Sequence, residues 1–78
     1  MAWRVLELGD TLWHVSCVAE RRANAVAYEL VLGFRRNPDG LSFWAAYPLS
    51  SVSKANLFKE AESIPDDRLA ALIAQHLS

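Results

Sequence analysis

Polar and hydrophobic residues alternate with a period of two in four successive parts of this sequence. Such alternation is typical of β-strands with one buried face, because successive side chains of a strand point to opposite sides. Polar or glycine-containing connections separate the four parts, which lie at about residues 3–8, 11–19, 24–35 and 41–49. The pattern predicts a four-stranded antiparallel sheet of meander order, in which strands that follow one another in sequence are neighbours.

The three connections predict how these strands are paired. Residues 9–10 are Gly-Asp, a two-residue loop typical of tight hairpins. Residues 37–40 are Asn-Pro-Asp-Gly, which is typical of a type I turn with proline at its second position. The middle connection, at 20–23, is polar and contains neither glycine nor proline. With these segments as loops, the register of every strand pair is defined.

The predicted register places Trp13 opposite both Leu6 and Leu30, and Phe34 opposite Phe43. A slip of one residue would turn the hydrophobic residues of a strand to the other face, so agreement among the three pairings is informative. All three pairings gather one hydrophobic set on one face, the predicted core layer: Trp13, Tyr28, Leu30, Phe43 and Tyr47.

After residue 49 the hydrophobic residues recur at helical spacing. Ser53 is a suitable N-cap for a helix at about 54–62, and Pro65 suits the first turn of a second helix. In that second helix the hydrophobic residues recur at i, i+3, i+4 and i+8: Leu69, Leu72, Ile73 and Leu77. The predicted fold class is therefore α+β, with one or two C-terminal helices packed on one face of the sheet.

We expect a single domain over residues 1–78, with the sheet at about 2–49 and the helical segment at about 54–77. The helices can cover one face of the sheet, and the other face is more hydrophobic than a solvated face normally is. Contiguous exposed hydrophobic residues mark interfaces or ligand grooves. The sequence therefore predicts an interaction face that includes Trp3, Val5, Leu12, His14, Glu29, Val31 and Trp44.

Two pairs on this second face have more than one interpretation. In the predicted register His14 lies opposite Glu29, which is either a carboxylate-oriented general base or a cross-strand ionic pair. The ionic pair is favoured, because no nucleophile, second acid or oxyanion donor converges there, and no catalytic residue is predicted. Trp44 lies opposite Gly33, where its indole either covers the glycine or takes part in an interface.

The composition of the chain reduces the number of functions that we expect. The chain has 78 residues, is 53% hydrophobic, and has a formal net charge of -1. This balance argues against nucleic-acid binding, which depends on clustered Lys and Arg. Cys17 is the one cysteine, so neither an internal disulfide nor a multi-thiolate zinc site is expected, and we predict no metal and no cofactor. Small domains without such links often gain stability from a partner, so a homodimer or a complex with another protein is expected.

The sequence also carries expectations about location. The N-terminus lacks the hydrophobic segment of a secretory peptide, and no hydrophobic stretch reaches the roughly 18 residues of a membrane span. Together with the free thiol, these features favour a cytoplasmic protein with no membrane partner.

The order of four strands followed by helical structure is similar to that of the small transcriptional-coactivator family, which grips single strands on a curved sheet. The resemblance implies an alternative function, single-stranded nucleic-acid binding, in which Trp3, Trp44 and Tyr47 would stack on bases. It is a resemblance of element order, and no motif of that family is matched, so no residue role is carried over. The positive charge that such a groove requires is missing.

Overall fold

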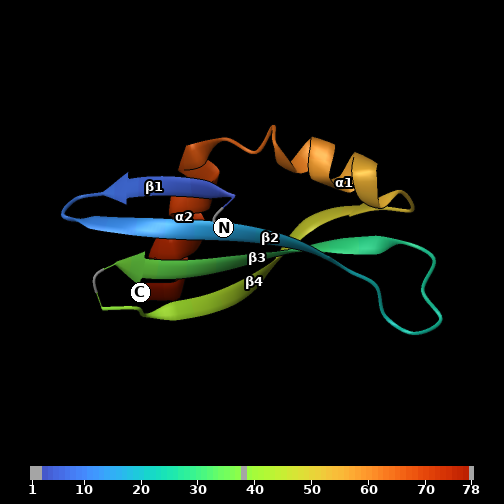
Figure 1. The fold of residues 1–78 in the computed structure, drawn as a ribbon, viewed down its shortest axis with the longest axis horizontal. Helices are drawn as coiled ribbons and strands as arrows, with labels where there is room; N and C mark the ends of the chain where they lie inside the picture. The colour runs from blue at the N-terminus through green and yellow to red at the C-terminus, as the bar shows by residue number, and fades with distance from the viewer. Residues whose placement is uncertain (1–2, 38, 78) are drawn as a thin grey trace.

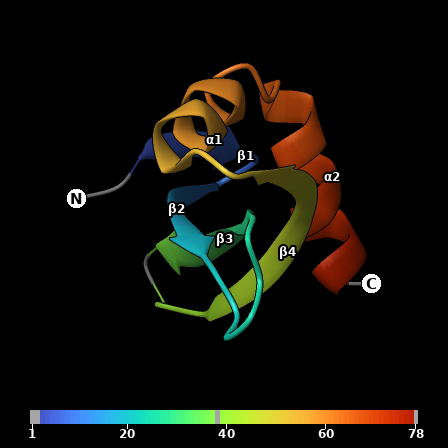
Figure 2. The same cartoon turned by 90° about the vertical axis from the view of Figure 1, so that its right-hand side faces the viewer.

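Four β-strands and two α-helices follow one another in the computed structural model, which describes residues 3–37 and 39–77 (Figure 1). The elements are β1 (Arg4–Leu8), β2 (Thr11–Glu20), β3 (Tyr28–Asn37), β4 (Ser42–Ser51), α1 (Lys54–Ala61) and α2 (Asp66–Leu77). The strands pair antiparallel in the order β1-β2-β3-β4. Figure 2 shows both helices against one side of the sheet. The predicted α+β meander fold is confirmed.

The first and third hairpins have the predicted registers. Leu6 pairs with Trp13 in the first hairpin, and Phe34 pairs with Phe43 in the third. The glycines of both turns, Gly9 and Gly40, have φ values of 60° and 77°, which side chains other than that of glycine rarely adopt. The proline predicted at the second position of the 37–40 turn lies outside the described residues, as does the expected start of the sheet at residue 2.

The second hairpin departs from the predicted register by six residues. Trp13 pairs with Arg36 instead of Leu30, because β3 begins at Tyr28 and residues 21–27 form a longer loop than expected. Asn24, with a φ of 70°, makes the turn within this loop that a glycine would otherwise mark. Because the shift is an even number of residues, every side chain of β3 keeps its predicted face.

The predicted core layer lies between the sheet and the helices. Trp13 and Leu30 are buried, while Tyr28, Phe43 and Tyr47 are half-buried and pack against the same core. The buried core consists of Leu6, Trp13, Val15, Leu30, Leu32, Phe34, Leu57, Ala61, Ile64, Leu69 and Ile73. Residues from all strands but β4, from both helices and from their linker thus form one core, and we call the side of the sheet that faces it the inner face.

Hydrogen bonds at their ends hold the helices over the inner face. Ser53 caps α1, because its hydroxyl accepts a hydrogen bond from the backbone N–H of Asn56 at 3.3 Å. Arg4, on β1, donates to the backbone carbonyls of Ile64 at 2.5 Å and Glu62 at 3.2 Å, and pairs with the Asp66 carboxylate at 3.1 Å. One guanidinium therefore ties the first strand to the linker between the helices.

The described helices are too short and too polar to cross a membrane.

Near its end, β4 changes register against β3 between Glu29 and Leu30, next to Pro48. Proline cannot donate a backbone hydrogen bond, and it is found in sheets at edge strands and at such irregularities. Pro48 therefore limits the addition of another strand at this edge.

Candidate interaction surface

The side of the sheet away from the helices, the outer face, is organised in rows that run across the strands. The row next to the 9–10 turn is Glu7, Leu12 and Asn37, and we name the four rows that follow it toward the 21–27 loop. The basic row is Val5, His14, Arg35 and Ser42; the glycine row is Ser16, Gly33 and Trp44; the valine row is Val18, Val31 and Ala46; the acidic row is Glu20, Glu29 and Ser50. Charged side chains therefore lie toward both ends of the face, Glu7 and Arg35 toward one and Glu20 and Glu29 toward the other, with small and hydrophobic residues between them.

Several hydrophobic side chains of this face are open to solvent. Trp44 is 63% exposed, Val5 52%, Val18 42% and Leu12 40%. These values contrast with the inner positions of the same strands, where Trp13 and Leu32 are almost fully buried. Six of the seven residues predicted for the interaction face lie on the outer face: Val5, Leu12, His14, Glu29, Val31 and Trp44.

Trp3, predicted for the interaction face and for base stacking, and Tyr47, predicted for base stacking, both pack against the core instead. Trp3 precedes β1, so strand alternation does not fix its direction, and it packs against the buried core with the Arg4 guanidinium 4.2 Å from its ring centroid. Tyr47 also packs against the core, on the inner face. Of the three aromatic residues considered for stacking on nucleic-acid bases, only Trp44 is displayed on the outer face.

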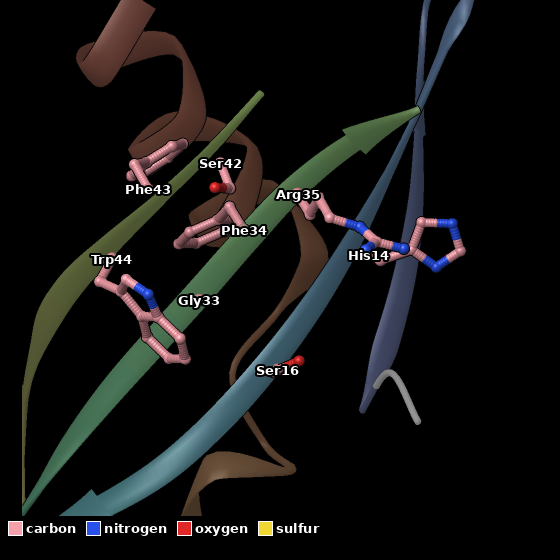
Figure 3. A pocket seen from close by; sticks show the side chains of 8 residues that line it. All are labelled: His14, Ser16, Gly33, Phe34, Arg35, Ser42, Phe43 and Trp44. Atoms are coloured by element: carbon pink, nitrogen blue, oxygen red, sulfur yellow. The ribbon is translucent and has the colours of Figure 1, made fainter. Parts of the chain in front are cut away.

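The indole of Trp44 lies over Gly33 (Figure 3). A Cβ atom built on Gly33 would be 2.6 Å from the Trp44 ring, so only glycine allows the ring to lie this close to β3. Both interpretations of the pair remain compatible with this geometry. One side of the ring covers the glycine, and the rest of the side chain is available to a partner.

A hollow of about 440 Å³ opens beside this indole on the outer face. It is lined by His14, Ser16, Gly33, Phe34, Arg35, Ser42, Phe43 and Trp44. Ser16 and Gly33 form its floor because their side chains are small or absent, and Figure 3 shows Arg35 extended across the face toward His14. The hollow therefore has a wall with basic side chains, a flat aromatic wall and a shallow polar floor.

The predicted pairing of His14 with Glu29 is wrong. The six-residue shift of the second hairpin places His14 between Val5 and Arg35, whereas Glu29 lies in the acidic row opposite Glu20. The ring nitrogen Nε2 of His14 is 3.2 Å from the amide nitrogen of Asn37. An amide replaces the carboxylate that a general-base arrangement would need, so neither the catalytic nor the ionic interpretation of the pair applies.

The acidic row carries an uncompensated charge. Glu20 and Glu29 are directly opposite each other on β2 and β3, and both are exposed. Like charges directly opposite on neighbouring strands are destabilising. The ion pairs found within residues 3–37 and 39–77 join Arg4 to Asp66 and Arg36 to Asp39, and neither reaches these two carboxylates.

The remaining candidate groups are the Cys17 thiol and the side chains that could ligate a metal ion. Burial raises the pKa of the Cys17 thiol, while the Arg4 guanidinium opposes this rise and the Glu62 carboxylate adds to it. A raised pKa leaves less of the reactive thiolate at neutral pH. Within the part of the chain that the structure describes, no three His, Cys, Asp or Glu side chains are grouped so that they could hold a metal ion.

Comparison of the chain with protein-family models, with curated proteins and with solved structures gives no significant match.

Proposed function

We propose that this protein is an interaction module that associates with a second copy of itself through the outer face and performs no catalysis. The single observation that carries the proposal is the exposed hydrophobic surface on the outer face, with Trp44 at 63%, opposite a face that the helices cover. Tryptophan is enriched among the residues that contribute most to protein interfaces. A domain of 78 residues also gains a useful margin of stability from burying such a surface.

The arrangement of polar groups supports binding over catalysis. Catalysis by acid–base chemistry needs a base close to a group that orients or activates it. His14 has the Asn37 amide beside it. The hydroxyl groups in its own row and in the next row belong to Ser42 and Ser16, and neither row contains a carboxylate. The charge of the face also supports a protein partner over a nucleic acid, because one Arg shares the face with the Glu20 and Glu29 pair.

Sedimentation equilibrium at chain concentrations from about 1 µM to about 1 mM tests the proposal. We expect a reversible monomer–dimer equilibrium. Val18→Lys should raise the dissociation constant roughly tenfold or more, because a lysine in the middle of the interface would lose its hydration. Trp44→Ser should have a still larger effect, since it removes the largest exposed side chain of the outer face.

The chain offers a matched control for the lysine substitution. Val26, in the 21–27 loop, is 77% exposed and lies outside the sheet, so Val26→Lys adds the same charge without touching the outer face. This variant should associate like the unmodified chain. A chain that stays monomeric throughout the concentration range, or equal effects of the two lysine variants, would contradict the proposal.

We also propose a cytoplasmic location for the module. The proposal rests on the free, half-buried thiol of Cys17, because oxidising compartments favour paired cysteines. Fractionation of cells that produce the protein with a small C-terminal epitope tests this location. Recovery of the protein from an exported or membrane fraction would contradict it.

A further inference from the structure

We infer that the second copy packs face to face with its strands antiparallel, about a two-fold axis that runs across the strands between the glycine row and the valine row. The inference rests on the proposed self-association and adds the arrangement of the two copies. A two-fold interface must be self-complementary, because every contact from one copy to the other occurs twice. The rows of the outer face meet this requirement in shape and in charge.

Shape complementarity follows from the middle rows. An axis between them brings the valine row of one copy onto the glycine row of the other. Val18 of one copy then faces Ser16 of the other, where the small side chain leaves the hollow open, and Val31 packs against the Trp44 indole that covers Gly33. On β4 the same operation brings Ala46 of one copy onto Trp44 of the other, so the largest side chain meets the smallest one of the neighbouring row. Close packing of side chains is what interface cores require.

Charge complementarity follows from the outer rows. The same axis brings the acidic row of one copy onto the basic row of the other, so Glu29 faces Arg35 and Glu20 faces His14. Each carboxylate of the opposed glutamate pair thereby gains a cationic or hydrogen-bonding partner. Opposite charges across an interface fix its register and exclude others. Association therefore offsets the repulsion between the Glu20 and Glu29 carboxylates of each copy.

A second two-fold axis that allows face-to-face packing runs along the strands, between β2 and β3. It keeps each row opposite itself, so the Glu29 carboxylate would face the Glu20 carboxylate of the second copy. Like charges brought together in an interface cost several kcal/mol. Valine would also meet valine while the two hollows faced each other empty. Both the charges and the shape therefore select the axis across the strands.

Sheet twist does not remove this selection. Facing sheets are commonly rotated by about 30°, which shifts contacts at the ends of the strands sideways by about one strand. A shift in one sense brings Glu20 onto Arg35 and Glu29 onto Ser42, and a shift in the other sense brings Glu29 onto His14 and Glu20 onto Val5. In either sense at least one glutamate keeps a partner in the basic row that can donate a hydrogen bond. The basic and acidic rows are six residues apart on β3, about 20 Å, and such a small contact predicts a weak dimer.

A charge exchange between two variants tests the arrangement. Arg35→Glu alone places two glutamates opposite each other at both symmetry-related contacts, and Glu29→Arg alone places two arginines there. Each variant should raise the dissociation constant of the dimer at least about tenfold. An equimolar mixture restores both contacts as opposite charges, so it should form a heterodimer with a dissociation constant within about threefold of the unmodified chain.

Two controls separate this register effect from a general effect of net charge. Arg22→Glu in the 21–27 loop and Glu60→Arg on α1 make the same changes of charge away from the outer face. Alone or mixed, they should associate like the unmodified chain. All four substitutions are at exposed positions, so thermal unfolding followed by circular dichroism should report folded variants.

The outcomes distinguish the inference from the proposed function. If the unmodified chain dimerises and loses its dimer on Val18→Lys, but Arg35→Glu strengthens association, the axis along the strands is correct and the inferred axis is wrong. A dimer that neither charge variant changes likewise overturns the inferred register and leaves self-association standing. If the unmodified chain and the mixture both remain monomeric, self-association and its register are both wrong.

Discussion

Neighbouring residues of β3 belong to two different environments. Leu30, Leu32 and Phe34 point to the inner face and are at most 1% exposed, whereas Val31 and Arg35 point to the outer face and keep contact with solvent. The two sets differ in what covers them, because the helices lie on one side of the sheet only. One alternating sequence therefore provides, from the same strand, a core for folding and a second surface that stays open to solvent.

The sharpest test of this comparison uses adjacent residues of one strand. Leu30→Ala removes a fully buried side chain of the core, and should lower the free energy of unfolding by about 2–5 kcal/mol. Val31→Ala, one residue further on, removes a half-exposed side chain and should cost less than about 1 kcal/mol. Urea unfolding, followed at a concentration where the protein is monomeric, measures both values.

Association should show the reverse order. Val31→Ala removes part of the valine row that we place against the glycine row of the second copy, so it should weaken the dimer, while the folded fraction of Leu30→Ala should still dimerise. Similar losses of stability for the two variants would mean that the outer face is as closely packed as the inner one, and the contrast between the faces would be lost.

A smaller effect is expected where the first strand holds the helices over the inner face. Arg4→Ala removes the hydrogen bonds to the Ile64 and Glu62 carbonyls and the ion pair with Asp66, so it should lower the free energy of unfolding by about 1–3 kcal/mol. Faster amide hydrogen exchange in the linker and in the start of α2 should accompany the loss.

Arg22→Ala is the matched control for this change, because Arg22 lies in the exposed 21–27 loop. It should leave stability within about 0.5 kcal/mol of the unmodified chain. Equal effects of the two alanine variants would show that the guanidinium of Arg4 does not secure the inner cover.

The smallest effect concerns the turn that joins the two C-terminal strands. The Arg36 guanidinium hydrogen-bonds Asp39, with Nε to Oδ1 at 3.0 Å, and this contact lowers the pKa of the Asp39 carboxyl to about 2. Because the folded chain binds this proton less readily than the unfolded one, the pair stabilises the fold above about pH 4. The contribution should fade as the pH falls from about 4 to about 2.

Thermal midpoints measured between pH 2 and pH 5 check this dependence, with Asp39→Asn as the comparison. The difference between the unmodified chain and the variant should shrink toward low pH. A difference that stays constant over this range would show that Asp39 acts through something other than its charge.

The fold could be predicted because turn chemistry and alternation agreed at most positions. Gly9 and Gly40 marked the two short turns, and both registers followed from them. The middle loop carried no such mark, since Asn24 adopts the positive φ there and neither glycine nor proline is present. Alternation excludes shifts by odd numbers of residues only, so it could not detect the shift of six.

The candidate surface was predicted correctly in the face of each strand side chain and wrongly in the neighbours across β2 and β3. The face of each side chain was predictable, as Val5, Leu12 and Trp44 show. Neighbours across β2 and β3 were not, and the supposed partner of His14 was therefore wrong. The opposed Glu20 and Glu29 and the hollow beside Trp44 depend on the correct register, so no signal in the sequence alone could have revealed them.

The contacts of Arg4 have a consequence for biosynthesis. They join residues 60 and 62 positions apart, so Arg4 cannot form its last bonds until the linker between the helices has been synthesised. During translation, the newly made sheet would therefore remain uncovered while residues 54–77 are still being synthesised. Chaperones that bind exposed hydrophobic surface on nascent chains would bind the sheet in that interval. A ribosome stalled before the codons of the linker would carry the chain with its sheet still uncovered.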